Sequence, residues 1–373
     1  MKTKCLALTK TFEEKSKAFE EKFKTFEEKA KTFEEKFKTF EEKAKAFEEK
    51  FKTFEEKPQT FPCRILVIGD LHFKINNTED SHDVIKDVLE KSRELKPDKI
   101  VLLGDTLDKH SVIHLLPLKR SIDFIGELSE ISPVYLIIGN HDRPNPRVFM
   151  TDDHPFTALK RWKNVKVVEK TLVEYPFVYV PYVPVGRFLE ALQGVDMKRV
   201  QCIFAHQEFR GSVLDTQGDE WPKDYPLVIS GHIHHHKIMN NIFYTGTPIQ
   251  HSFYEPPENF IFLFSFPPVE NGKITVDYIP TRTRKKVLIK TTAEDFVKVY
   301  EEISEEDPNE YLIVVHGYPR AFDVIPKKNV KIQPKIKESK RENPSPIKNF
   351  MDRLEEKIKD DPECKEWLKK LSS

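Results

Sequence analysis

The sequence predicts an α/β domain built on two facing sheets over residues 63–280, with a small α+β cap behind it and a heptad-repeat helix in front. Three observations predict this organisation. Short apolar runs, such as 64–70 and 99–105, flank a segment with apolar residues at helical spacing, 83–95, which is typical of a βαβ unit. A strict seven-residue repeat precedes the first run. A polar stretch that contains proline follows the last module.

Composition limits the classes of protein that the chain can belong to. Its 373 residues are enough for one large core and smaller modules, and its 61 basic residues balance 61 acidic ones. Nucleic-acid binding would therefore need a local basic patch. The four cysteines are scattered, which predicts reduced thiols in a cytoplasmic protein. Within the cytoplasm, the protein is expected to be either free or associated with the nucleoid or with replication sites. No apolar run is long enough to predict a membrane span, and we expect no membrane partner.

The N-terminal repeat occupies residues 11–57, after a short segment at 1–10. Phe recurs every seven residues from Phe12 to Phe54, and four places later comes Phe or a small residue. This is the heptad pattern of a coiled coil, and its helix would be roughly 70 Å long. An exposed Phe stripe predicts pairing with a second copy, so we expect a homo-oligomer. The alternative is a tandem expansion without a structural role. Two prolines in 58–62 end the helix and form a linker.

The remaining elements follow in chain order. Apolar runs predict further strands at 133–139, 177–183, 200–206, 227–232, 241–247, 259–266 and 273–279. Helical patches are expected at 156–162 and 188–192.

A smaller module is predicted over residues 281–334, where two apolar strands flank a helix that begins after the capping residue Thr292. Residues 335–346 form a polar linker. The tail, 347–373, has apolar residues on one face of a helix and is expected to bind a partner.

Five of the predicted strands end in side chains that bind metals. These are Asp70 and His72, Asp105 and Asp108, Asn140 and His141, His206, and His232 and His234. Each pair alone is weak evidence, because "GD" and "GH" are common turns. Together they indicate an active site, because open α/β sheets place ligands at the carboxyl ends of their strands. Histidine and carboxylate without cysteine favour manganese, iron, magnesium or zinc, and so many donors favour two ions.

The ordered motifs D-x-H, GD-x-x-D, GNHD, H and GH-x-H resemble those of the calcineurin-like metallophosphoesterases. The resemblance implies a metal-dependent phosphoesterase with two divalent ions, for which we expect manganese. It implies the following roles: Asp70, His72 and His234 as ligands of one metal; Asn140, His206 and His232 as ligands of the other; Asp105 as the bridge; His141 as the catalytic acid; and the Asp108 carboxylate as the group that orients it.

The segment "YTGTPIQHSFYEP", residues 244–256, is similar to a segment of SbcD-type DNA-repair nucleases, although Thr245 and Thr247 depart from the family pattern. The cap, polar linker and terminal helix follow in the same order as in that family. This resemblance implies a DNA exonuclease or endonuclease that acts in recombination and repair. It also implies that the C-terminal helix binds an SbcC-type coiled-coil ATPase.

Basic residues near these motifs are candidates for contacts with DNA phosphates, foremost Arg143, Arg147 and Arg210. The alternative function is a phosphatase of small molecules or phosphoproteins, with the heptad segment as a scaffold.

Overall fold

The computed structural model describes residue 38 and residues 62–110, 112–213, 218–268, 272–317 and 327–335. The heptad segment apart from Lys38, and the C-terminal helix predicted at 347–373, lie outside these ranges. By their contacts the residues form two units, Met1–Ile65 with Phe264–Val276, and Leu66–Leu263 with Asp277–Ser373. All the predicted site residues belong to the second unit.

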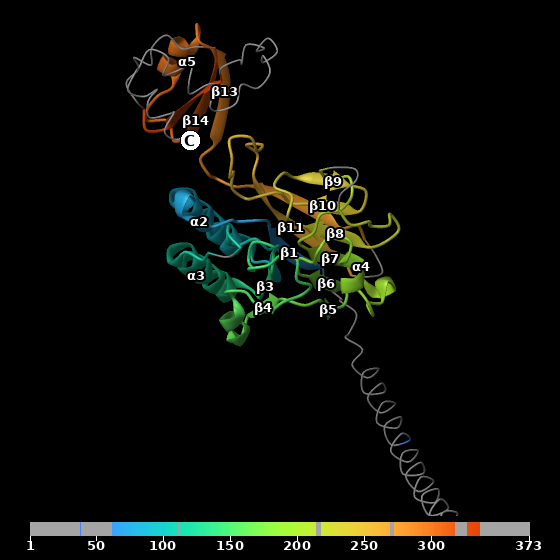
Figure 1. Ribbon diagram of the computed structural model, residues 1–373. Helices are drawn as coiled ribbons and strands as arrows, with labels where there is room; N and C mark the ends of the chain where they lie inside the picture. The colour runs from blue at the N-terminus through green and yellow to red at the C-terminus, as the bar shows by residue number, and fades with distance from the viewer. Residues whose placement is uncertain are drawn as a thin grey trace, which may run out of the picture. The chain divides into compact units, whose positions relative to one another are not determined.

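Two six-stranded sheets form the larger domain (Figure 1). The first has the order β12-β11-β1-β2-β3-β4 and comprises β1 (Cys63–Ile68), β2 (Lys99–Leu102), β3 (Val134–Ile137), β4 (Val165–Val168), β11 (Phe260–Phe266) and β12 (Thr275–Pro280). The second has the order β5-β6-β7-β8-β10-β9 and comprises β5 (Leu172–Glu174), β6 (Phe177–Val180), β7 (Cys202–Ala205), β8 (Leu227–Ser230), β9 (Lys237–Met239) and β10 (Ile242–Tyr244). Five strand pairs are parallel: β2–β3 and β3–β4 in the first sheet, and β6–β7, β7–β8 and β8–β10 in the second. This mixed α/β architecture agrees with the predicted fold class.

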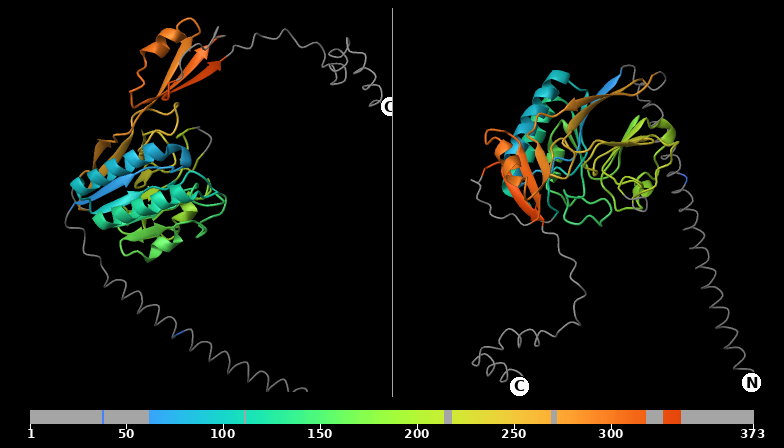
Figure 2. Two further views of the ribbon diagram at one scale, coloured as in Figure 1. Left: turned by 90° about the vertical axis from the view of Figure 1, so that its left-hand side faces the viewer. Right: turned by 90° about the horizontal axis from the view of Figure 1, so that it is seen from above.

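Alternation along the strands places the two sheets face to face. Val134 and Leu136 of β3 belong to the core that is covered by α2 (Thr78–Leu95) and α3 (Leu115–Ile131). Tyr135 points to the opposite face, where its ring stacks on Tyr179 of β6 with centroids 4.3 Å apart. Figure 2 shows α2 and α3 side by side on one face of the first sheet. The second sheet packs its outer face on a core that includes Phe188 of α4 (Phe188–Ala191).

Short 3₁₀ helices connect several of these elements, at η1 (Ile75–Asn77), η2 (Thr157–Arg161) and η3 (Met197–Arg199). No helix in the described ranges is both long enough and apolar enough to cross a bilayer.

The smaller module is a three-stranded parallel sheet, β13 (Lys286–Thr292), β14 (Glu310–His316) and β15 (Val330–Lys335), with α5 (Phe296–Glu302) between its first two strands. Phe296 and Tyr300 pack on Ile313 and Val315 in a core of its own.

The sequence patterns predict neither α3 nor the strands β4, β5, β9 and β15. Pro334 in β15 argues against a strand, but an edge strand tolerates proline. Exposed leucines and Pro117 hide the helical spacing at the start of α3, where proline is tolerated in the first turn.

Phe124 of α3 packs in the core between this helix and the first sheet. Its side chain is 1% exposed and meets the ring of Phe73 edge to face, with centroids 6.1 Å apart. We expect Phe124→Ala to lower the free energy of unfolding by about 3–5 kcal/mol, because it removes apolar area and leaves a cavity. Leu115→Ala, at a position on the same helix that is 81% exposed, should change it by less than about 0.5 kcal/mol. Urea unfolding followed by circular dichroism measures both, and equal losses would contradict the burial argument.

Candidate active site

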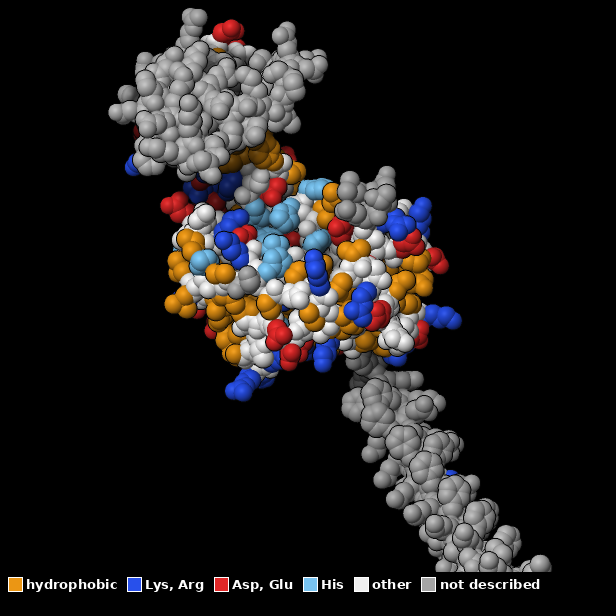
Figure 3. Space-filling view, in the orientation of Figure 1, with side chains coloured by type: hydrophobic (Ala, Val, Ile, Leu, Met, Phe, Trp, Pro, Cys, Tyr) orange, Lys and Arg blue, Asp and Glu red, His pale blue; other side chains and the backbone are white. Residues whose placement is uncertain are grey.

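The predicted metal-binding side chains gather where strands of both sheets end. Asp70 and His72 follow β1, Asp105 follows β2, and Asn140 follows β3 in the first sheet; His206 follows β7, and His232 and His234 follow β8 in the second. Figure 3 shows histidines grouped in a hollow on one face of the larger domain. The loops that leave these facing strand ends therefore bring together residues that are far apart in sequence.

Three of these residues have left-handed backbone conformations. The φ angles are 42° at His72, 46° at Asp105 and 74° at His232. Such conformations cost non-glycine residues about 1–3 kcal/mol each and persist only where the surroundings enforce them. All three side chains belong to candidate metal-binding groups.

Glycines before the ligands allow the strand ends to approach closely. A Cβ atom at Gly139 would lie 2.2 Å from Asp105 Oδ1, and one at Gly231 would lie 2.4 Å from Asp70 Oδ1. No side chain fits in either place. The "GD", "GN" and "GH" pattern of the sequence thus has a packing reason in addition to any turn.

Asp70, His72 and His234 form the first donor group, with one donor atom of each within 4.8 Å of the others. The Nε2 atoms of His72 and His234 are 3.1 Å apart, and Asp70 Oδ1 is buried without a hydrogen-bond partner. Burial raises the pKa of Asp70 to about 7 and holds the pKa of His72 well below its usual value. Converging nitrogens beside an unpaired buried carboxylate oxygen are what a cation site requires.

Asp105, His206 and His232 form a second donor group, which Asn140 completes. Asn140 Oδ1 lies 2.9 Å from His206 Nε2 and 2.9 Å from His232 Nδ1. His206 donates its Nδ1 proton to the Leu103 carbonyl at 2.8 Å, which directs Nε2 into the site.

Asp105 lies between the two groups. Its Oδ2 is 3.2 Å from His206 Nε2 and 3.6 Å from His72 Nε2, while its Oδ1 accepts the backbone N–H of His141 at 2.8 Å. Burial alone would raise its pKa, but His206, together with His72 and His141, outweighs burial and holds the pKa far below the usual range. A carboxylate that stays ionised between two donor groups has the position of a bridging ligand.

These donors fit two divalent cations. The set is imidazole, carboxylate and amide oxygen without thiolate, which suits hard or borderline ions. Burial opposes the charge on His206, but Asp105 and Asp70 raise its pKa to about 9. At neutral pH this imidazole therefore carries a second proton, on Nε2. Cations in the same place would displace that proton and balance the carboxylates.

His141 lies beside both groups, with its Nε2 4.0 Å from Asp105 Oδ2. Its Nδ1 donates to the backbone carbonyl of Asp108 at 2.6 Å. This corrects the predicted role of the Asp108 carboxylate, whose Oδ1 instead lies 3.4 Å from Lys74 Nζ and 3.7 Å from His72 Nδ1. The Asp108 carbonyl can orient the His141 ring as a carboxylate would, because it accepts the proton of Nδ1 and leaves Nε2 facing the site.

His110 supports His141. Its ring stacks on His141 with centroids 4.2 Å apart, and its Nδ1 donates to the Asn140 carbonyl at 2.7 Å. The sequence signal for it was weak, because a histidine five residues after Asp105 has many ordinary uses.

Glu255 and His251 also belong to the site, although no sequence motif pointed to them. Glu255 Oε1 accepts from His234 Nδ1 at 2.9 Å, and its Oε2 accepts the backbone N–H of His251 at 2.7 Å. The His251 ring lies against His72, with centroids 5.1 Å apart. Both residues belong to the segment 244–256, whose resemblance to nucleases could have pointed to them.

Of the three predicted DNA-facing arginines, Arg143 is corrected by the structure. It is 1% exposed, and its guanidinium lies 4.9 Å from the centre of the Tyr182 ring, so it cannot contact a phosphate at the surface. Arg147 and Arg210 are exposed, and Arg210 pairs with Glu220.

Replacing Glu255 tests its control of His234. Glu255→Gln keeps the shape but removes the charge that orients and strengthens the imidazole as a ligand, so manganese affinity should fall about 10- to 100-fold. Calorimetric titration of the metal-free protein with manganese measures this. Glu208→Gln is the matched control, because Glu208 Oε2 is 4.0 Å from His232 Nε2 and accepts no hydrogen bond from a predicted ligand within the described residues. An unchanged affinity in Glu255→Gln would exclude this role.

Comparison with known proteins identifies relatives of this chain. The profile described as "Calcineurin-like phosphoesterase" matches residues 63–265. The chain is 42% identical over 223 residues to "Putative phosphoesterase 244L" of Invertebrate iridescent virus 6, an alignment that covers 57% of this chain and 79% of that protein. It is 37% identical over 266 residues to "Putative phosphoesterase 078R" of Invertebrate iridescent virus 3, covering 68% and 76%. "Exonuclease subunit 1" of Enterobacteria phage T4 is 25% identical over 204 residues, covering 50% and 59%. Since the profile spans more than half of the sequence, the chain belongs to the calcineurin-like phosphoesterase family.

Proposed function

We propose that the chain is a manganese-dependent DNA nuclease, the phosphodiester-cleaving subunit of an SbcCD-like recombination or repair complex. The observation that carries the proposal is the pair of donor groups joined by Asp105, with His141 at their edge. Two cations held there would act as Lewis acids on the phosphate and lower the pKa of the attacking water.

His141 is the proton donor in this proposal. Its Nδ1 proton is committed to the Asp108 carbonyl, so only Nε2 can give a proton to the leaving oxygen. Stacking on His110 and the edge contact with His72, with centroids 4.8 Å apart, hold the ring in place. Asn140 supplies a ligand oxygen without charge, and its neighbour His141 is therefore free to act on the substrate.

The likeness to "Exonuclease subunit 1" of phage T4 favours nucleic acid over other phosphoesters. The names of the relatives with higher identity specify only a phosphoesterase, so phosphomonoesters are the contrast in the test below. Exposed Arg147 and Lys109 supply positive charge for a DNA backbone without reading its sequence.

Two parts of the proposal concern residues outside the described ranges. The amphipathic segment 347–373 would bind the coiled-coil ATPase, and a pull-down that survives its deletion would exclude this. The heptads at 11–57 would pair two copies, and light scattering that gives equal masses with and without them would exclude that.

Separate variants distinguish the proposed proton donor, His141, from the proposed bridging ligand, Asp105. His141→Asn should lower the rate of hydrolysis by at least about 100-fold and leave bound metal near the wild-type amount, because general acid catalysis contributes about 10²- to 10⁴-fold. Asp105→Ala should lose both metals. Inductively coupled plasma analysis and rate measurements on the same preparations decide between the roles. Since His141 can also be grouped with His72 and Asp105 as a donor, loss of metal in His141→Asn would make it a ligand instead.

The substrate class is tested with linear DNA. In manganese, wild-type protein should degrade linear DNA, and His141→Asn should not. Hydrolysis of p-nitrophenyl phosphate should be slower by at least about 100-fold in kcat/KM, because that substrate lacks the flanking phosphates that bind the positive groups. Gel analysis and absorbance assays compare the two. Rapid monoester hydrolysis with intact DNA would favour the phosphatase.

A further inference from the structure

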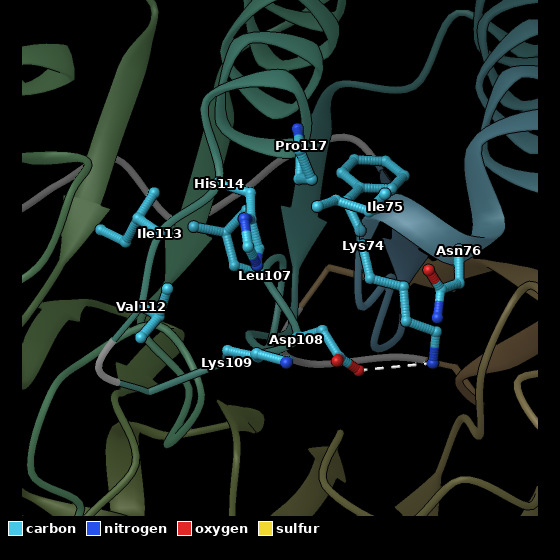
Figure 4. Close-up of a pocket in the computed structure, with 11 residues that line it drawn as sticks. Lys74, Ile75, Asn76, Leu107, Asp108, Lys109, Val112, Ile113, His114 and Pro117 are labelled. Carbon is cyan, nitrogen blue, oxygen red and sulfur yellow. Dashed lines mark hydrogen bonds and ion pairs between the residues drawn. The ribbon is translucent and has the colours of Figure 1, made fainter.

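An apolar pocket adjoins the active site. It has a volume of about 140 Å³, and its apolar walls are Phe73, Ile75, Leu107, Val112, Ile113 and Pro117. Figure 4 shows Val112 and Ile113 on one side and Ile75 on the other, with Asp108, Lys109 and the end of Lys74 along one edge. The metal-binding side chains do not line this pocket, so it is a separate feature of the same face.

Asp108 joins this pocket to the proposed chemistry. Its carbonyl accepts from His141 Nδ1 at 2.6 Å, and its carboxylate lines the pocket, where Oδ1 lies 3.4 Å from Lys74 Nζ. The loops that carry the ligands His72 and Asp105 continue directly into the pocket walls. A group in the pocket would therefore lie next to the bond at which His141 acts.

Three of the six apolar wall residues are open to water. Ile75 is 51% exposed, Val112 55% and Ile113 48%. Isolated exposed apolar residues are ordinary, but three around one concave pocket mark a binding site for an apolar group.

Size and charge limit the occupant. An engineered protein cavity of about 150 Å³ lined by similar side chains binds benzene, so a pocket of about 140 Å³ fits one six-membered ring. Lys74 is paired with Asp108, but the exposed Lys109 at the pocket edge suits a ring that is attached to phosphates. An apolar protein side chain would have no use for Lys109.

We propose that this pocket holds an unstacked pyrimidine-sized nucleobase of the nucleotide next to the bond that is cut. The inference rests on the proposed nuclease function and assigns that site a base subsite. The base would enter between Ile75 and Ile113, and Lys109, which is exposed, would face the adjoining phosphate. Burying one base against such walls favours cleavage beside it by about five- to 100-fold over a nucleotide without a base.

The test uses end-labelled single strands of thymidines in which one position, scanned along the strand, lacks its base. Wild-type protein in manganese should cut at least about fivefold more slowly at the bond beside the abasic position, mapped at single-nucleotide resolution. Val112→Ala combined with Ile113→Ala removes much of the wall, and the ratio of the two rates should then fall below about twofold.

Leu115→Ala combined with Leu116→Ala is the matched control. These side chains are 81% and 51% exposed at the start of α3, and neither lines the pocket, so the ratio should stay at the wild-type value. Circular dichroism establishes that each variant is folded.

The possible outcomes separate the nuclease function from the base subsite. If wild-type protein cuts no strand, the nuclease function and the base subsite both fail. If it cuts every bond at one rate regardless of the missing base, the subsite alone fails. A wall variant that keeps the wild-type ratio, or a control variant that loses it, also overturns the subsite.

Discussion

The buried charge of Asp105 is the constraint on which the rest of the site depends. One of its oxygens faces His206 and His72 and the other accepts the backbone N–H of His141. An ionised carboxylate at 2% exposure is costly unless positive charge compensates it. Without cations, His206 supplies that charge, which is why its pKa is raised even though burial opposes it. The ring nitrogens of His206, His72 and His141 all lie within 4.0 Å of Asp105 Oδ2.

The backbone around Asp105 is strained. His72, Asp105 and His232 all have positive φ angles, and Gly139 and Gly231 leave no room for a Cβ atom. Asp142 holds two of the loops in register, since its carboxylate accepts the N–H groups of Leu107 and Gly139, both at 3.0 Å. The strained loops thus depend on buried hydrogen bonds and on compensation of the central charge. Bound cations would favour the folded state, because they bind only the assembled geometry.

The sequence was sufficient to predict the donor set because the ligands follow apolar strands, and parallel strands end at a common edge. It was not sufficient where the outcome depends on which atom of a residue is used or on how deeply a side chain lies. Nothing local indicates that Asp108 acts through its carbonyl, or that Tyr182 covers Arg143. Glu255 reaches His234 from a loop 21 residues away, a contact that no periodicity encodes. In the same way, α3 and β15 are set by packing against neighbours, which outweighs their prolines.

The contacts of Asp108 also connect His141 with the apolar pocket. Because its carbonyl holds His141 while its carboxylate pairs with Lys74, one short loop fixes the proton donor and one edge of the apolar pocket. A displacement of this loop would move the acid and the pocket together. In the proposed nuclease, this coupling keeps Nε2 of His141 within reach of the leaving oxygen whichever base follows. Two separate loops would allow the acid and the pocket to drift apart, and proton transfer falls off steeply once the groups are out of hydrogen-bond reach. The use of a backbone carbonyl is then an advantage, because it positions His141 without adding a further carboxylate to the one of Asp70 beside Asp105.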